Sequence, residues 1–229
     1  LVDAYVNRPA LSLAAGTRRN YRTQLNAISK IVDPEGHSFE FTPLDEKSGY
    51  VPYTAEEMDR FRRWAVFQRA EGRRLRGMMM LACCAGAGCR AREIGILTHK
   101  DIVDTGNGFE IHIGGATPRV VPLLAEWEEW MAEILSVRPR NQTLWGKPKG
   151  SRANNLLSSF TQYSDGQPPH GGRLRNTWLL RLLELRVPLT DLYYAAGAQK
   201  LEHLGRLARH LPLLDPTEYQ KTLRGEVNR

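Results

Sequence analysis

The chain has 229 residues and a mass of 26.0 kDa, and its 41% hydrophobic and 25% charged residues indicate a folded domain with a core rather than a chain disordered throughout. The formal net charge is +7 and the sequence pI is near 9.5, a balance that favours a polyanionic partner. The longest apolar run, Met78 to Cys89, is shorter than the roughly 20 residues a bilayer requires, so we expect no membrane partner.

The first predicted element is a short basic helix over residues 17–31. Apolar residues recur there at helical spacing, and three arginines stand beside them. Residues 32–52 are rich in Pro, Gly, Ser and charge, which is typical of a linker. We therefore divide the chain into a basic N-terminal segment (1–31), a linker (32–52) and one larger domain (53–229).

Three helices are predicted to open this domain. Thr54 and Glu57 form a capping box, and hydrophobic residues follow at helical spacing. A second helix, Leu75 to Ala85, is apolar enough to be buried, and the glycines around position 87 end it. A third, shorter helix begins near Ala91 and ends by Thr98.

The pattern then changes to a period of two. Phe109 to Ile113 alternates, Gly114 and Gly115 turn the chain, and Arg119 to Pro122 returns as the second strand of an antiparallel hairpin. Further helices are predicted over Leu124 to Leu135, Ala153 to Tyr163 and Leu174 to Leu185, and a last one begins after Asp215. The expected fold class is mainly α with a small antiparallel β-sheet (α+β).

The cysteines of the chain, Cys83, Cys84 and Cys89, lie close together on one apolar stretch. Their odd count and adjacency argue against a disulfide framework, and no second ligand cluster stands at zinc-binding spacing. We therefore expect free thiols, no metal and a reducing cytoplasm. The first four residues also lack the basic and apolar regions of a signal peptide.

The segment with the most chemical content surrounds Arg90. A buried helix ends there in a Gly-rich turn, and the next helix places Glu93 one turn further on. A guanidinium at such a turn, beside free backbone N–H groups, suits a phosphate. The alternative interpretation is that Arg90 only pairs with Glu93 and stabilises the turn.

This segment resembles the first motif of the tyrosine recombinases, the phage integrase family, Gly-x-Arg-x-x-Glu, which Gly88 to Glu93 matches. The predicted hairpin is similar to the family's strand pair, and Leu174 to Trp178 resembles part of the second motif, His-x-Leu-Arg-His-Thr. The resemblance covers about Tyr50 to the C-terminus and implies the catalytic-domain fold of the family. The basic helix before the linker also resembles a remnant of the family's core-binding domain, which clamps DNA.

The resemblance implies phosphodiester exchange on double-stranded DNA. In the family a Tyr attacks a DNA phosphate, which leaves a 3′-phosphotyrosine and a free 5′-hydroxyl. Two arginines hold the non-bridging oxygens, while a Lys on the hairpin and histidines assist proton movement. The arginines supply the electrostatic stabilisation, so no metal and no cofactor is expected.

The sequence departs from this pattern at the proton-transfer positions. Residues 114–118 of the hairpin contain no Lys, and the nearest cation, Arg119, belongs to a residue type that is a poor proton donor. If Arg175 is the second arginine, Gly172 and Asn176 stand where the family has His. A second register pairs His170 with Arg173 instead, but it loses the apolar helix face that the Arg175 register keeps.

The nucleophile has two candidate positions. The usual interval from Arg175 places the family's Leu-Gly-His on residues 196–198 and its Tyr on Leu207. Alternatively, Tyr219 follows His210 by nine residues and lies in the first turn of the helix that Asp215 caps, where the helix dipole favours a phenolate. That placement needs an insertion, and the simpler interpretation is that Tyr219 only packs.

The resemblance thus implies four catalytic residues, one supporting residue and a set of DNA contacts. The catalytic residues are Arg90, Arg175, His210 and Tyr219, and Glu93 supports them. The DNA contacts are Arg18, Arg19, Arg22, Arg92, Lys100, Arg119 and Arg173.

The absence of these proton-transfer groups should lower the rate of catalysis more than the affinity for DNA. Such groups contribute about 10² to 10⁴ in rate each, whereas DNA affinity rests on distributed Lys and Arg contacts. We expect a DNA-binding protein of the recombinase and integrase type that self-associates on DNA and is nucleoid-associated if its source is bacterial or phage. If active, it breaks and rejoins DNA without metal. The alternative is a helical protein-interaction domain whose arginines form a solvated face.

Overall fold

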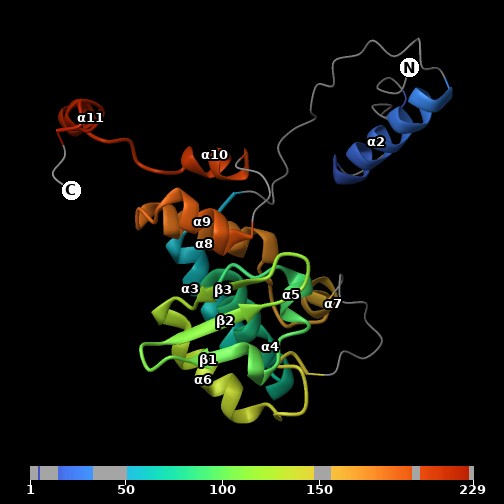
Figure 1. The fold of residues 1–229 in the computed structure, drawn as a ribbon. Coiled ribbons are helices and arrows are strands. Elements are labelled where there is room, and N and C mark those ends of the chain that lie inside the picture. The colour runs from blue at the N-terminus through green and yellow to red at the C-terminus, as the bar shows by residue number, and fades with distance from the viewer. Residues whose placement is uncertain (1–4, 6–14, 33–50, 147–155, 198–201, 227–229) are drawn as a thin grey trace. The chain divides into compact units, whose positions relative to one another are not determined.

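The computed structural model of the chain describes residues 5, 15–32, 51–146, 156–197 and 202–226 (Figure 1). The chain forms two compact units, residues 1–48 and residues 49–229. Most of the predicted linker, the start of the helix predicted from Ala153 and the residues around Ala198 lie outside the described residues.

Apart from Tyr5, the described part of the first unit is the helix α2 (Ala15–Val32), which confirms the helix predicted over residues 17–31. Arg18 is half-buried and Arg22 is buried, while the side chain of Arg19 lies outside the described residues. The apolar side chains of Ile28 and Ile31 are exposed.

The second unit begins with the predicted capping box. Thr54 Oγ1 accepts a hydrogen bond from the Glu57 backbone N–H at 3.2 Å, and the Glu57 carboxylate accepts one from the Thr54 N–H at 2.9 Å. These bonds satisfy N–H groups that the first turn of α3 (Ala55–Val66) leaves without helical partners. The inner face of α3 packs against α4 (Glu71–Leu81).

The helix predicted over residues 75–85 differs in its second half. After α4 the chain continues as a π-helical segment, Ala82–Gly86, in which the carbonyl of Cys83 accepts hydrogen bonds from the N–H groups of Ala87 and Cys89. The wider turn delivers the chain to Gly88, whose φ of +60° reverses its direction. The next helix, α5 (Ala91–Ile94), is one turn long and stops earlier than predicted.

The predicted hairpin is confirmed and belongs to a three-stranded antiparallel sheet. Its strands are β2 (Phe109–Ile113) and β3 (Arg119–Pro122), and β1 (Ile102–Asp104) adds to the outer side of β2. Ile111 pairs with Ile102 on one side and with Val121 on the other, and all three side chains are buried. The sheet therefore presents its apolar face to the helical core.

The remaining elements are helical, as predicted, and complete a mainly α fold with a small sheet. They are α6 (Glu128–Val137), α7 (Leu156–Gln162), α8 (Gly171–Glu184), α9 (Leu189–Ala196), α10 (Glu202–Ala208) and α11 (Pro216–Leu223). The first begins later than predicted, because residues 125–127 form a 3₁₀ turn.

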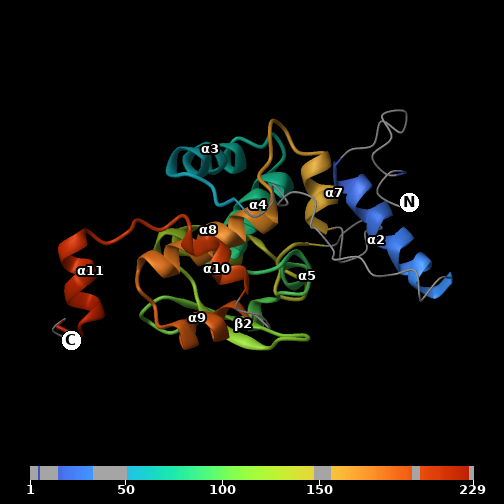
Figure 2. The same ribbon diagram turned by 90° about the horizontal axis from the view of Figure 1, so that it is seen from above.

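Helix α8 connects the π-helical segment before Gly88 with the helices near the C-terminus of the second unit. It packs against the π-helical segment and against α9 and α10, and α9 in turn contacts β3 (Figures 1 and 2). Its first turn begins at Gly171, three residues earlier than predicted. Leu174 and Trp178 point into the core from this helix and are almost completely buried.

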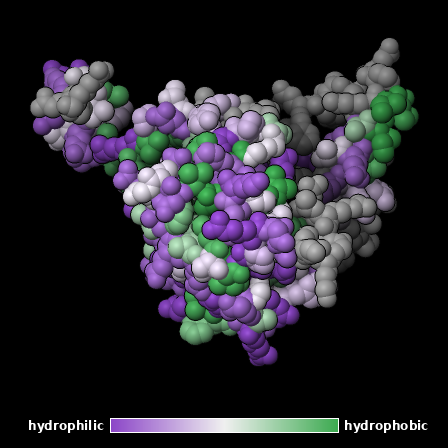
Figure 3. Space-filling view, turned by 60° about the horizontal axis from the view of Figure 1, so that its bottom comes forward, coloured by the Kyte–Doolittle hydropathy of each residue, from purple (hydrophilic) through white to green (hydrophobic). Residues whose placement is uncertain are grey.

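Among the helices that the structure describes, none is both long enough and apolar enough to cross a bilayer. On the face shown in Figure 3, hydrophilic and hydrophobic residues are interspersed.

Candidate functional site

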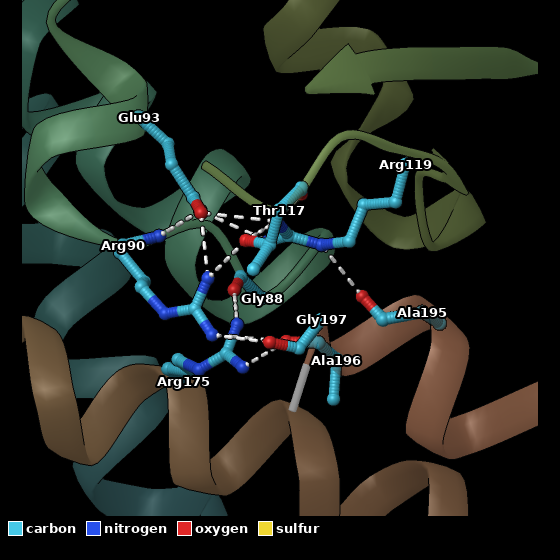
Figure 4. Close-up of polar contacts among 9 residues, drawn as sticks. All are labelled: Gly88, Arg90, Glu93, Thr117, Arg119, Arg175, Ala195, Ala196 and Gly197. Carbon is cyan, nitrogen blue, oxygen red and sulfur yellow. Dashed lines mark hydrogen bonds and ion pairs between the residues drawn. The ribbon is translucent and has the colours of Figure 1, made fainter. Parts of the chain in front are cut away.

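The fold brings Arg90 and Arg175 together on one shared backbone oxygen, the carbonyl of Ala196. Arg90 Nη2 donates to the carbonyl of Gly197 at 2.7 Å and to that of Ala196 at 3.4 Å. Arg175 Nη2 donates to the same Ala196 carbonyl, and its Nη1 donates to the carbonyl of Gly88 (Figure 4). The two guanidinium groups, far apart in the sequence, therefore converge at the C-terminal end of α9.

The turn at Gly88 is what allows this meeting. A Cβ atom on Gly88 would lie 2.2 Å from the ring of Trp178, so only glycine lets the turn approach α8 this closely. Arg175 stands one helical turn before Trp178 and bonds to the Gly88 carbonyl. Arg90 follows two residues later as the N-cap of α5 and is thereby aimed at the same place.

The Glu93 carboxylate binds both Arg90 and Arg119. Its carboxylate accepts hydrogen bonds from Arg90 Nη1 at 2.8 Å and from the Arg90 backbone N–H at 2.7 Å. It also accepts two from Arg119, at 3.0 and 2.9 Å. Burial alone would raise the pKa of Glu93, but the hydrogen bonds and the charge of Arg119, with those from Arg90, outweigh burial and lower the pKa to about 2.

Arg119 does not have the place that the sequence suggested. It was expected to contact DNA, but its side chain is 1% exposed and forms a bidentate ion pair with Glu93. Its Nε also donates to the carbonyl of Ala195 at 2.9 Å. The reason is the alternation of β3, which turns position 119 to the same buried face as Val121. Arg119 therefore positions Glu93 and α9 rather than facing a ligand.

The cluster carries an excess of positive charge. Arg90, Arg119 and Arg175 against the single carboxylate of Glu93 give the four side chains a net charge of +2. Burial, together with the charges of Arg90 and Arg119, lowers the pKa of Arg175 to about 10. Arg175 remains protonated at neutral pH, and a bound anion would relieve the repulsion among the three guanidinium groups.

The two candidates for the second arginine, Arg173 and Arg175, lie in different places. Arg173 turns toward the start of α3, where Nε donates to the carbonyl of Val51 at 2.7 Å and the guanidinium lies 3.8 Å from the centre of the Tyr53 ring. An ion pair of 3.6 Å with Glu57 completes this arrangement. Arg175, not Arg173, is therefore the partner of Arg90.

A cavity of about 300 Å³ opens beside the two arginines. Arg90 and Arg175 line it together with α7 and the beginning of α8, which contribute among others Ser158, Thr161 and His170. Sequence reasoning did not find Thr117, whose hydroxyl accepts a hydrogen bond from Arg90 Nη1 at 3.0 Å. The only sequence signal for such a contact was its place in the hairpin turn, two residues before Arg119.

The residues predicted for the nucleophilic end of the site are not assembled in this structure. Leu207, at the position that the usual interval gives to the Tyr, is a buried core residue of α10. Tyr219 is 54% exposed on α11, a helix without a buried residue, and His210 is also exposed. Arg92 and Lys100 are exposed on the surface of the second unit. The roles of Tyr219, His210, Arg92 and Lys100 stay predictions.

Comparison with known proteins relates the chain to others through its structure alone. Neither a model of a known protein family nor a curated protein matches the sequence. Among solved structures, the XerH site-specific recombinase bound to its difH substrate matches with a TM-score of 0.62 and 18% identity, over 99% of this chain and 69% of that one. The Tn1549 transposon integrase in complex with circular intermediate DNA matches with a TM-score of 0.62 and 16% identity, over 99% and 85%.

A third structure, the XerA recombinase, matches with a TM-score of 0.54 and 13% identity, over 100% of this chain and 82% of that one. The chain therefore has the fold of the tyrosine recombinases and integrases, as the resemblance of its motifs predicted. At such low identity the fold is shared while most side chains are not, so the chemistry of the site rests on this chain's own residues.

Proposed function

We propose that this chain binds double-stranded DNA in the manner of the tyrosine recombinases and integrases, and that Arg90 and Arg175 hold one phosphodiester of the bound strand. The observation that carries the proposal is the convergence of the two guanidinium groups on neighbouring oxygens. The fold adds support, because both XerH and the Tn1549 integrase, with which it is shared, were crystallised with DNA.

The carbonyls of Ala196 and Gly197 indicate that the site accepts oxygens that carry negative charge. Each arginine offers N–H donors to an oxygen at the end of α9, where the helix dipole places partial negative charge. A phosphodiester presents two oxygens on one phosphorus with a full negative charge, and charge-assisted hydrogen bonds from guanidinium groups are stronger than those to a carbonyl. The net charge of +2 on the cluster favours that exchange.

The process in which the chain would act is site-specific recombination or integration of DNA. Its catalytic set is incomplete, because residues 114–118 contain no Lys and the usual nucleophile position holds Leu207. We therefore assign DNA binding to the site of Arg90 and Arg175. Strand cleavage would require a second conformation of the protein, in which Tyr219 reaches the phosphate. That arrangement needs α11 to meet the site on DNA.

Other parts of the chain complete the proposed partnership with DNA. Helix α2, with the half-buried Arg18, belongs to the basic segment 1–31, which we assign as a second DNA-contacting element before the domain 53–229; Arg22, predicted as a further contact, is buried. Arg92 and Lys100 are exposed and available for further phosphate contacts. We further propose self-association on DNA and, if the source is bacterial or phage, a nucleoid-associated location.

The proposal is tested by comparing two arginine variants in a gel-shift titration with a DNA duplex. Arg90→Ala removes hydrogen bonds to a charged ligand and should weaken binding by about 10-fold or more. Arg73→Ala removes an exposed arginine, 42% exposed and 3.7 Å from Asp165, and should change binding by about two-fold at most. Equal effects of the two substitutions would show that Arg90 forms no special phosphate site.

Salt separates this function from a protein-interaction domain. DNA binding through several phosphate contacts weakens steeply as salt rises, because counterions are released from the DNA. An apolar interface with another protein hardly responds to the same change. Affinity that is independent of salt would contradict the proposed function.

A further inference from the structure

Two arginines meet at a turn that is separate from the site of Arg90 and Arg175. Arg76 stands on α4 and Arg138 follows the last turn of α6, and these two helices pack against each other. A Cβ atom built on Gly146 would lie 2.9 Å from Nη1 of Arg138 and 3.7 Å from Nη2 of Arg76. Both guanidinium groups therefore border one small space, which a side chain at position 146 would begin to fill.

The turn that borders this space is anchored in the core. Trp145 is buried and packs edge to face on Phe160, with the ring centres 5.4 Å apart. Its carbonyl accepts a hydrogen bond from Arg76 Nε at 3.1 Å, and the Arg76 guanidinium group lies 5.9 Å from the centre of the Trp145 ring. The N–H of Gly146, where φ is +80°, donates to the Thr143 carbonyl at 2.9 Å. Arg76 and the turn are therefore held in place without a ligand.

Arg138 lacks the acceptors that a buried guanidinium group needs. Its Nε and Nη2 are buried, and neither has a hydrogen-bond partner in the part of the chain that the structure describes. Buried polar groups are nearly always paired, and a charged donor without an acceptor is unfavourable. These two nitrogens form one edge of the guanidinium plane, and such an edge can bind two oxygens of one phosphate or carboxylate group.

The two arginines also lack a counter-charge of their own. Within the described ranges, no carboxylate forms an ion pair with Arg76 or Arg138. Burial lowers the pKa of Arg138 and the charge of Arg76 lowers it too, while Glu71 acts in the opposite direction. The Glu71 carboxylate, however, accepts two hydrogen bonds from Arg74, at 2.9 and 2.8 Å. The guanidinium groups of Arg76 and Arg138 therefore repel each other, and a bound anion would relieve that repulsion.

We propose that Arg76 and Arg138 form a second oxyanion site, which binds a phosphate group at the turn of Gly146. A phosphate group is negatively charged and presents several acceptor oxygens, so it can bond to both guanidinium groups at once. None of these three residues lines the cavity beside Arg90 and Arg175. The inference thus goes beyond the proposed function. The phosphate group belongs either to the backbone of bound DNA or to free phosphate, and the chemistry that recognises it is the same.

The first experiment measures thermal unfolding of the full chain in inorganic phosphate and in chloride, at the same ionic strength and at neutral pH. A ligand of the folded state stabilises it, so phosphate at about ten times its dissociation constant should raise the Tm of the wild type by about 3 °C or more relative to chloride. Arg138→Gln should lose most of this rise, because it removes one of the two guanidinium groups. An arginine with only a structural role would lower the Tm equally in both salts when replaced.

Control variants separate binding from the general effect of phosphate, which stabilises proteins because it is excluded from their surfaces. Arg140→Gln removes an exposed arginine two positions further on and should keep the wild-type response. Gly146→Ala fills the space between the guanidinium groups and should lose it. Gly106→Ala should keep it, because φ is +78° there but nothing lies within 4 Å of the added Cβ.

The second experiment identifies the source of the phosphate group by measuring affinity for a DNA duplex over a range of salt concentrations. If the phosphate group belongs to bound DNA, Arg138→Gln should weaken binding more than Arg140→Gln does and should reduce the salt slope by about 1. If it is free phosphate, Arg138→Gln should bind DNA as the wild type does while losing its response to inorganic phosphate.

The inference is refuted if Arg138→Gln matches Arg140→Gln both in its response to phosphate and in DNA binding, even where its Tm is lower by the same amount in both salts. This failure is distinguishable from failure of the proposed function, which concerns Arg90. Arg90→Ala should weaken DNA binding but keep the part of the phosphate response that depends on Arg138. If the wild type binds no DNA, the proposed function falls, and the response to inorganic phosphate still decides this inference.

Discussion

Replacing Glu93 by Gln should destabilise the protein more than any surface charge substitution. The carboxylate accepts hydrogen bonds from two groups of Arg119, from the Arg90 side chain and from the Arg90 backbone. Glutamine has the same shape, but it keeps one acceptor oxygen and turns an NH₂ group toward a guanidinium. Arg119, with 1% of its side chain exposed, is then a buried charge without its counter-charge.

The expected loss follows from that burial. Breaking a buried ion pair by removing one partner costs about 3–5 kcal/mol, because the remaining charge stays desolvated. For a domain of this size that corresponds to a fall in Tm of about 10 °C. Glu184→Gln is the matched control, since Glu184 pairs with Arg181 at 3.5 Å on the exposed side of α8, and its loss should stay below about 1 kcal/mol.

The same substitution should change how stability depends on acid. The pKa of Glu93 is lowered from 4.5 to about 2 in the folded chain, so the folded state binds its proton less readily than the unfolded state does. Its stabilising contribution is therefore complete above about pH 4.5 and is lost as the pH falls toward 2. The Glu93→Gln variant should lack this part of the acid destabilisation, while Glu184→Gln should retain it.

Urea unfolding of the three proteins at neutral pH and at several acid pH values measures both effects. The reasoning fails if Glu93→Gln loses no more stability than Glu184→Gln at neutral pH. It fails equally if the free energies of unfolding of Glu93→Gln and of the wild type fall in parallel below pH 4.5.

Three other predictions concern the turn, the nucleophile and the DNA contacts. Gly88→Ala should lower the free energy of unfolding by about 1–3 kcal/mol more than Gly106→Ala, because both have positive φ but only at position 88 would the added Cβ strike Trp178; equal losses in thermal unfolding would contradict this. A suicide DNA substrate should trap a covalent adduct only if the chain cleaves DNA, and Tyr219→Phe should then abolish it; an adduct that persists in the variant would identify another nucleophile. The logarithm of the DNA-binding constant should fall linearly with the logarithm of the salt concentration, with a shallower slope for Arg90→Ala than for the wild type, and identical slopes would show that Arg90 meets no phosphate.

Local patterns in the sequence were sufficient for most elements. The capping box at Thr54, the alternation of β2 and β3 and the Pro-containing start of α11 each depend on neighbours within a few residues, and all are present in the structure. The Gly-rich turn before Arg90 was predicted for the same reason. The π-helical segment before that turn was not, because an apolar run of this kind fits either helix type equally well.

The arrangement of the site depended on residues distant in the sequence. The sequence correctly predicted that Arg90 and Glu93 lie one helical turn apart. It also predicted Arg119 as a DNA contact, whereas strand β3 buries this side chain against Glu93. Likewise, only the packing of α8 showed that Arg175 meets Arg90 while Arg173 turns away.

What the sequence determined by itself is therefore the set of elements and the residue types they carry, because hydrogen bonds within a helix or a hairpin join near neighbours. Which guanidinium groups converge and which one is buried were decided by tertiary structure. The contact between Arg175 and the carbonyl of Gly88 spans 87 residues of sequence. It forms only because the Trp178 ring fits against a turn without a side chain, and no local pattern encodes the packing of those two surfaces.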